Sequence, residues 1–270
     1  MAYSSHAKRW MTVAVIVPIL VAFFLMAPAW AFAIFGGFIS AFALYEYFKN
    51  FCKTNAPMDL GYCFAVIGSS LIFWAAAIGS FKLLFLVMWL MFFVYASRAM
   101  IRFNQGKAGY DLLAKEALSI LYIPCLLSSV VLARCSENGV TWLFFILFLA
   151  FISDTGAYYA GKTFGKHKLI PNLSPNKTVE GSIGSIFADL IVVTVFKLTL
   201  LPTIPWLVVP VLAASAAIAT QLGDLFESML KRSLDVKDSG TIFPGHGGML
   251  DRIDGLLFTG PVVYLFLVTF

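Results

Sequence analysis

The chain has 270 residues, of which 60% are hydrophobic and 12% are charged, whereas a typical soluble domain has roughly 25% charged residues. This composition excludes a water-soluble globular protein and predicts an integral membrane protein. The formal net charge of +5 does not indicate a nucleic-acid partner, because no long basic run or nucleic-acid motif accompanies it. An excess of Lys and Arg also orients a multi-span protein.

Long apolar runs predict an all-α, polytopic fold. Segments of about 17–25 apolar residues cross a ~30 Å hydrocarbon layer as helices, and no alternating pattern of a β-barrel recurs. We expect about nine transmembrane helices, near residues 10–27, 29–48, 59–78, 82–100, 112–133, 140–161, 180–200, 205–226 and 253–270.

The basic residues test this span count, because Lys and Arg gather in cytoplasmic loops. With nine spans, 16 of the 19 basic residues fall on one side, and only Lys82, Arg134 and Lys197 fall on the other. This bias predicts a cytoplasmic N-terminus and a C-terminus on the opposite side.

The first span has two readings. Lys8 and Arg9 precede an apolar run that ends near Pro28, which is also the pattern of a signal peptide. The run is longer than a usual signal-peptide core and leads almost directly into another span, so we favour a retained helical hairpin that turns at Pro28. The four cysteines lie far apart without metal-ligand spacing, and we expect buried free thiols.

A carboxylate interrupts the sixth span. Asp154 lies in the half that the charge bias makes cytoplasmic, next to the small residue Gly156. A carboxylate at membrane depth is costly, so it marks either a functional site or a structural hydrogen bond between helices. We favour function, and we expect Gly156 to allow a close approach by another group.

A basic loop, residues 161–181, follows this span. Its GKT triplet at 161–163 lacks the P-loop spacing. Ser174 to Thr178 precede a predicted helix that contains Glu180, and helix N-termini bind anions. We therefore favour a phosphate-binding role for Lys177. Lys162, Lys166 and Lys168 are more typical of charges that orient the protein, and His167 of a solvated loop residue.

The stretch from Asp224 to Asp254 is polar in an apolar chain, with 10 of the chain's 33 charged residues. Helical spacing places Gln221, Asp224 and Ser228 on one face, with Glu227 three residues after Asp224. The two carboxylates either share a cation or are the ordinary charges of a helix end that emerges into water. Lys231 and Arg232 follow at the predicted membrane boundary. They either mark that boundary only or contact a lipid headgroup in the inner leaflet.

A glycine-rich segment and a second acidic pair complete this stretch. Residues 244–248 read PGHGG, and glycines permit close backbone approach to a ligand. Asp251 and Asp254 follow at i,i+3. They could simply favour a helix N-terminus, but Asp154, Glu180 and Asp224 are predicted at the same membrane face. Carboxylates gathered at one face suit a hard cation such as Mg²⁺.

The motifs of this region resemble those of the phosphatidate cytidylyltransferases, also called CDP-diacylglycerol synthases. The resemblance rests on SMLKR at 228–232, KDSG at 237–240 and PGHGGMLDRID at 244–254. SPNKTVEG at 174–181 and the span with Asp154 also match, so motifs cover about residues 150–270. Asn176 departs from the family pattern, in which this position is often basic.

The resemblance implies transfer of the cytidylyl group of CTP to phosphatidic acid, giving CDP-diacylglycerol and pyrophosphate. It makes Asp224 and Asp251 the metal ligands, with Mg²⁺ as the cofactor and a monovalent cation such as K⁺ as a second cation. The catalytic set that it implies is Asp224, Asp251, Asp254, Lys177, Lys231 and Arg252. The substrate-binding set is Asp154, Ser174, Thr178, Glu180, Glu227, Arg232, Lys237, Asp238, Gly245, His246, Gly247 and Gly248.

The expected setting follows from these interpretations. Residues 1–110 would form a transmembrane scaffold, and 111–270 a catalytic region with its site at the cytoplasmic face of a bacterial plasma membrane. CTP, phosphatidic acid and the membrane are the expected partners, nucleic acid is not, and a homodimer is a family expectation. The competing hypotheses are a transporter or channel, a sister enzyme that acts on another lipid, and a purely structural membrane protein.

Overall fold

The computed structural model describes residues 17–54, 58–106, 108–234, 240 and 247–270. Within them, most of the chain is helical. The helices are Val17–Met26, α2 (Ala29–Asn50), α3 (Leu60–Ala77), α4 (Phe81–Asn104), α5 (Gly109–Ile120), α6 (Leu126–Cys135), α7 (Gly139–Phe164), α8 (Val179–Thr199), α9 (Val208–Arg232) and α10 (Leu250–Thr269), and the π-helical segment η1 (Leu121–Cys125) joins α5 to α6.

The predicted spans are confirmed from the second to the ninth. Eight helical segments of the described chain are long and apolar enough to cross a membrane, with Gly109–Cys135 as one of them. Of the predicted first span, residues 10–27, the structure describes only the part from Val17. That part is a helix ending at Met26, and α2 begins at Ala29 after Pro28, so the predicted turn at Pro28 is present.

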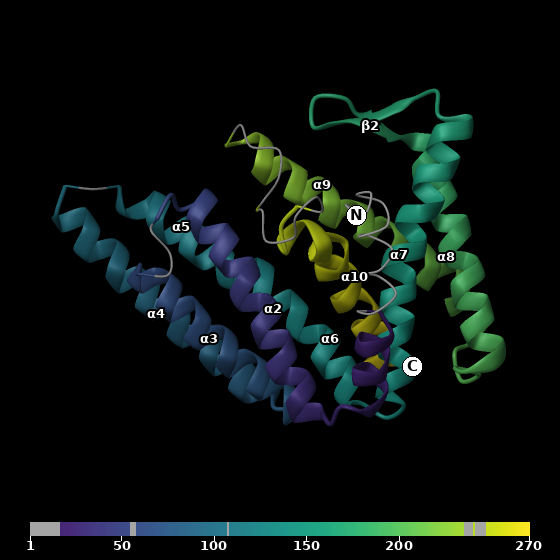
Figure 1. The fold of residues 1–270 in the computed structure, drawn as a ribbon, viewed down its shortest axis with the longest axis horizontal. Helices are drawn as coiled ribbons and strands as arrows, with labels where there is room; N and C mark the ends of the chain where they lie inside the picture. The colour runs from purple at the N-terminus through teal and green to yellow at the C-terminus, as the bar shows by residue number, and fades with distance from the viewer. Residues whose placement is uncertain (1–16, 55–57, 107, 235–239, 241–246) are drawn as a thin grey trace, which may run out of the picture.

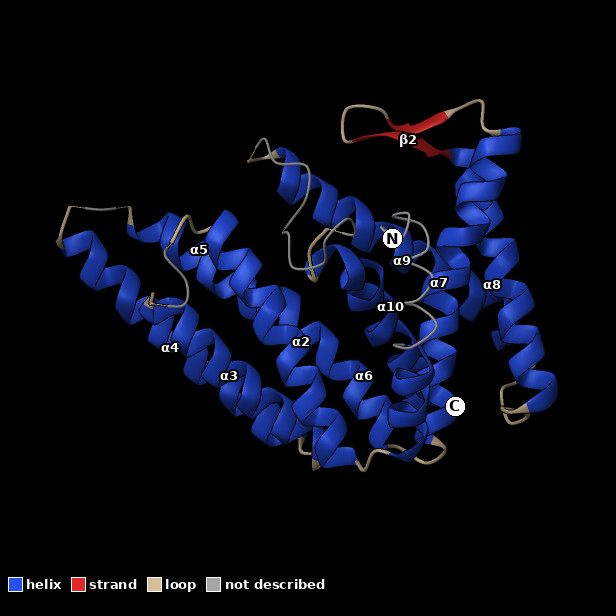
Figure 2. Ribbon diagram, in the orientation of Figure 1, coloured by secondary structure: helices blue, strands red, loops and turns tan. Residues whose placement is uncertain are grey.

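Two features were not predicted. The loop between α7 and α8 contains strands β1 (Lys168–Ile170) and β2 (Ser174–Thr178), paired antiparallel, which Figure 2 shows in red. The fifth span is also not a uniform α-helix, because η1 contains Pro124. Proline lacks a backbone N–H and clashes with the preceding turn, so the helix widens locally into a π-bulge.

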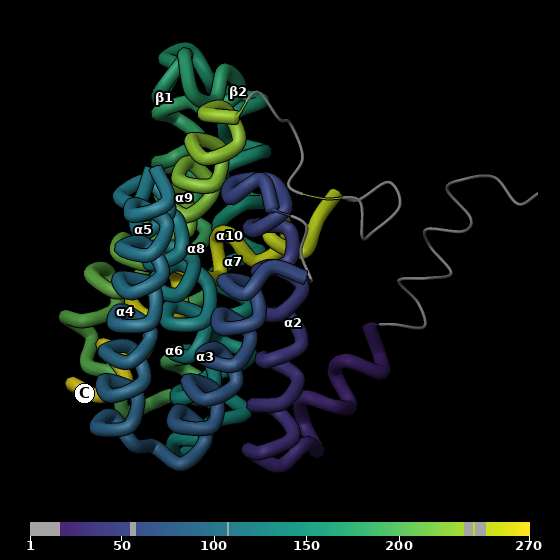
Figure 3. Tube along the Cα trace, turned by 90° about the vertical axis from the view of Figure 1, so that its left-hand side faces the viewer, coloured from purple at the N-terminus to yellow at the C-terminus, as the bar shows by residue number. Residues whose placement is uncertain are grey.

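The helices form one bundle in which α6 and α10 lie centrally, with α2 to α5 on one side and α7 to α9 on the other (Figure 1). The view turned by 90° also shows α10 behind the layer of α3, α4 and α5 (Figure 3). The start of α10, the end of α9 and the β-hairpin lie toward the same end of the bundle. The opposite end holds the start of α4 and the ends of α6 and α8 (Figure 1), which carry Lys82, Arg134 and Lys197. The described basic residues therefore segregate as predicted.

Small residues permit the closest helix contacts. A Cβ on Gly156 of α7 would lie 3.0 Å from the Gly184 carbonyl oxygen of α8, which confirms that Gly156 admits a close neighbour. Such small-residue contacts are typical of membrane helices. The cysteines are free, but the expectation that they are buried is wrong: Cys63 is exposed and the other three are only partly buried. An apolar stretch of a membrane protein can face lipid as well as the protein core, so it does not show that a side chain within it is buried.

Candidate active site

Helices α9 and α10 approach most closely beside the predicted acids. If Gly223 carried a Cβ atom, that atom would lie 3.0 Å from the carbonyl carbon of Asp254 and still closer to its carbonyl oxygen. A Cβ atom on Gly255 would likewise lie 3.0 Å from the Thr220 side chain. A buried hydrogen bond of 2.6 Å between the hydroxyls of Thr220 and Thr259 joins the helices deeper in the bundle. The glycines therefore bring Asp224 of α9 alongside Asp254 of α10.

Three carboxylates and one lysine form the first part of the site. Asp154 of α7, Asp224 and Asp254 are close enough for each to repel the other two electrostatically. Lys177 of β2 forms an ion pair with Asp224 and also attracts Asp154. The structure thus brings together residues predicted from three separate stretches of the chain.

A second lysine links two further acids. Lys231 Nζ lies 2.6 Å from Glu227 Oε2 and 2.8 Å from Asp251 Oδ1. Asp251 Oδ2 accepts a 2.7 Å hydrogen bond from the backbone N–H of Gly248. Gly247 has a φ of 81°, a left-handed conformation that favours glycine. This part joins the end of α9 to the first turn of α10.

The β-hairpin carries Lys177 to the site. At its base, both carboxylate oxygens of Glu180 accept hydrogen bonds from the backbone N–H of His167, and Glu180 Oε2 also accepts one from the N–H of Lys166 at 3.1 Å. The exposed His167 ring also contacts Glu180 at 2.6 Å. Thr178 caps α8 by accepting a hydrogen bond from the N–H of Gly181. Glu180 and Thr178 therefore shape the hairpin, and the prediction that they bind substrate stays a prediction.

The other predicted residues lie around these two groups. Ser174 is half-buried at the start of β2, and Arg232 and Arg252 are exposed at the end of α9 and in the first turn of α10. Four predicted residues lie outside the described residues, namely Lys237, Asp238, Gly245 and His246.

Sequence reasoning missed Glu46, at the end of α2. It is buried, with 2% of its surface exposed, and its carboxylate accepts hydrogen bonds from the backbone at the start of α10. The available signal was a single acid in an apolar run, four residues before the end of α2. Such an acid reads equally well as a residue emerging at the membrane boundary.

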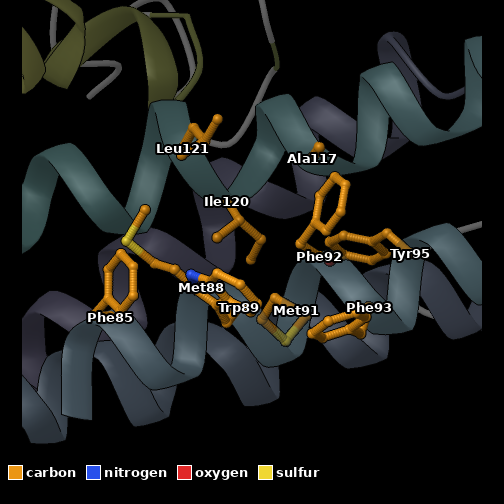
Figure 4. Close-up of a pocket in the computed structure, with 10 residues that line it drawn as sticks. All are labelled: Phe85, Met88, Trp89, Met91, Phe92, Phe93, Tyr95, Ala117, Ile120 and Leu121. Carbon is orange, nitrogen blue, oxygen red and sulfur yellow. The ribbon is translucent and has the colours of Figure 1, made fainter. Parts of the chain in front are cut away.

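Two apolar cavities differ in their relation to the site. One, of about 500 Å³, lies between α4 and the α5–η1 region and is lined by Phe85, Tyr95 and Ile120 among others (Figure 4); no predicted site residue lines it. The other, of about 560 Å³, lies among Val17–Met26, α2, α6, α7 and α10. Arg252 is the one charged residue among the described residues that line it.

The carboxylates at the end of α9 and the start of α10 are the groups that could bind a cation such as Mg²⁺. Glu227 is buried beside Asp251, and the two carboxyl groups share Lys231. Carboxylate oxygens are the ligands of Mg²⁺, which needs only one or two of them because waters and phosphates complete its shell. Among the described residues, no group of three or more His, Cys, Asp or Glu side chains could hold a metal ion by itself. A Mg²⁺ ion here would therefore take only one or two of these carboxylates and complete its shell with water and substrate phosphate.

Comparisons with known proteins agree with these motifs. The model of the cytidylyltransferase family matches residues 7–270 of the chain. A phosphatidate cytidylyltransferase of Bacillus subtilis is 41% identical over 162 residues, which are 60% of each chain. Proteins of the same name from Staphylococcus saprophyticus and Staphylococcus aureus are 37% and 38% identical over 59% of this chain. The matched part is 64% of each Staphylococcus protein, so all three matches span less than two thirds of the relatives' lengths.

Proposed function

The chain belongs to the cytidylyltransferase family, and from this premise we propose that it transfers the cytidylyl group of CTP to phosphatidic acid. The products are CDP-diacylglycerol, a precursor for phospholipid synthesis, and pyrophosphate. The relatives named phosphatidate cytidylyltransferase support this choice of substrates.

The first turns of α10 lie between a polar site and an apolar cavity, and this position supports the proposal most directly. Asp251 and Asp254 take part in the two polar groups, whereas Arg252, Ile253 and Leu256 line the 560 Å³ cavity. A phospholipid has the matching division into an anionic headgroup and an apolar tail. We propose that the cavity takes an acyl chain of phosphatidic acid and that Arg252 binds its phosphate.

The reaction is an in-line displacement at phosphorus. An oxygen of the lipid phosphate attacks the α-phosphorus of CTP, a new P–O bond forms, and the bond from that phosphorus to the bridging oxygen of the β-phosphate breaks. Pyrophosphate leaves with the electron pair. The attacking phosphate is already ionised at neutral pH, so no side chain needs to remove a proton, and catalysis consists of positioning and charge stabilisation.

The lysines supply positive charge where phosphates converge. Lys177 and Lys231 are held beside Asp224 and Asp251, and both come from elements at the same end of the bundle. We propose that they contact CTP phosphates, together with the backbone of Gly247 and Gly248. Arg232, exposed at the end of α9, would attract the anionic substrates.

A metal ion is part of the proposal. We propose that Asp224 and Asp251, one from each of the two polar groups, would hold Mg²⁺, with Glu227 buried beside Asp251. When bound, Mg²⁺ would neutralise charge on the transferred phosphoryl group and on pyrophosphate. A monovalent cation such as K⁺ is proposed as a second cation at the same carboxylates.

The proposed orientation places this site at the cytoplasmic face. The excess of basic residues at the site's end of the bundle supports it, as does the solubility of CTP in the cytosol. Phosphatidic acid would enter from the inner leaflet of a bacterial plasma membrane, in agreement with the bacterial relatives. A homodimer remains a proposal from family resemblance.

A pyrophosphate-release assay on purified protein tests the function. We expect release from CTP that requires phosphatidic acid and Mg²⁺, and near-complete loss in Asp251→Asn with an unchanged yield of folded protein in detergent. Release with a different lipid substrate but not with phosphatidic acid would indicate a sister enzyme. Absence of any lipid-dependent release from CTP would overturn the proposal.

A further inference from the structure

The buried carboxylate of Glu46 lies where α2 meets the catalytic end of α10. Its Oε1 accepts a hydrogen bond of 2.9 Å from the backbone N–H of Met249, and its Oε2 accepts one of 2.9 Å from that of Leu250. These partners are more than 200 residues away in the chain. A buried carboxylate in an apolar bundle is unfavourable unless its oxygens are hydrogen-bonded, so these contacts explain how it is accommodated.

The two N–H groups belong to a helix start that lacks a side-chain cap of its own. Met249 is the N-cap residue of α10 and makes no side-chain capping bond. The first N–H groups of a helix have no partner within the helix, and a carboxylate near them also interacts favourably with the helix dipole. Glu46 therefore acts as the cap of α10 from another helix.

Gly240 also lies against Glu46. A Cβ on Gly240 would lie 2.9 Å from Glu46 Cγ and closer still to its carboxylate. Only glycine avoids this overlap without movement. Glu46 thus lies close to Gly240 as well as to the start of α10.

The residue after this cap is Asp251. Its carboxylate bonds to Lys231 of α9 and to the N–H of Gly248, so the rotation of the first turn of α10 decides where Asp251 points. We propose that Glu46 is a positioning residue for the cytidylyl-transfer site: by holding Met249 and Leu250, it orients Asp251 and the adjoining Gly247–Gly248 backbone. This inference rests on the proposed function.

The test compares Glu46→Gln with Glu116→Gln. Glutamine keeps the size of the side chain and one acceptor oxygen, but its amide nitrogen cannot accept the second N–H. Glu116 is a matched control, because it is equally buried and pairs with Arg98 at 3.0 Å, away from α10. We expect kcat per folded protein to fall about tenfold or more in Glu46→Gln, with the KM for CTP within about twofold. Glu116→Gln should lower thermal stability without lowering kcat.

Hydrogen–deuterium exchange gives a readout that does not depend on activity. Glu46→Gln should exchange faster than the wild type in a peptide covering 247–253, while a peptide from α7 stays unchanged. Glu46→Ala, which removes both acceptors, should exchange faster still. Unchanged exchange at 247–253, an unchanged kcat, or an equal loss of kcat in Glu116→Gln would overturn the inference. If the wild type lacks phosphatidate-dependent activity, the proposed function fails, and exchange alone decides whether Glu46 positions α10.

Discussion

Replacing Gly223 with alanine should separate the two helices that carry the site. Its new Cβ would lie 3.0 Å from the carbonyl carbon of Asp254 and 3.1 Å from Gly255 Cα, and closer still to the Asp254 carbonyl oxygen. All three are backbone atoms, which cannot move aside as a flexible side chain would. Helix α10 must therefore shift away from α9.

The expected size of the effect follows from overpacking. Forcing an extra methyl group into a packed interior destabilises proteins by about 1–3 kcal/mol. The shift would also lengthen the Thr220–Thr259 hydrogen bond, now 2.6 Å, and would change the spacing of Asp224 and Asp254. If about 1.4 kcal/mol of this strain reaches the transition state, kcat/KM falls about tenfold.

Thermal unfolding in detergent and pyrophosphate release measure the two effects. Gly37→Ala is the matched control, because nothing lies within 4 Å of a Cβ at that position of α2, and alanine favours helix over glycine. Gly37→Ala should be neutral or slightly stabilising with full activity. A Gly223→Ala protein as stable and as active as the wild type would refute the argument that this glycine contact sets the site.

Three further predictions follow from the site and its surroundings. Lys177→Met should lower kcat/KM for pyrophosphate release about ten- to a hundredfold, because a charge-assisted contact contributes about 1.5–3 kcal/mol. The control is Lys49→Met, at an exposed position, which should have little effect in the same assay. Glu180→Ala removes the acceptor of the Lys166 and His167 N–H groups, so trypsin should cleave the hairpin faster; unchanged cleavage would show that Glu180 does not hold it. Leu147 lines the 560 Å³ cavity, so Leu147→Trp should fill part of it. This variant should raise the KM for long-chain phosphatidic acid about tenfold but leave the KM for a short-chain form unchanged. Leu198→Trp, on the exposed surface of α8, should raise neither KM.

The acids illustrate how far sequence reasoning reaches. Hydropathy and charge bias indicated that Asp154, Asp224 and Asp254 share a membrane face, and the structure places them together. The same reasoning grouped Glu180 with them, yet its oxygens are taken by the N–H groups of Lys166 and His167. Hydropathy reports how deep a residue lies along a helix, but not in which direction its side chain points.

Local anomalies were harder to predict than the spans. The π-bulge at Pro124 and the β-hairpin before α8 depend on how neighbouring helices complete the backbone hydrogen bonds, which no periodic pattern records. The Lys177–Asp224 pair likewise needs the hairpin to fold back toward α9. The motif made Lys177 a candidate, but its partner became known only with the fold.

By itself, the sequence determined the membrane class, the helices from Ala29 onward and the side on which the polar residues gather, because these depend on composition and on order along the chain. Only the tertiary structure decided which residues meet. Gly223 matters because the backbone of Asp254 lies against it, and Glu46 because the start of α10 donates to it. Contacts between segments more than 200 residues apart arise from helix packing, which one-dimensional patterns do not encode.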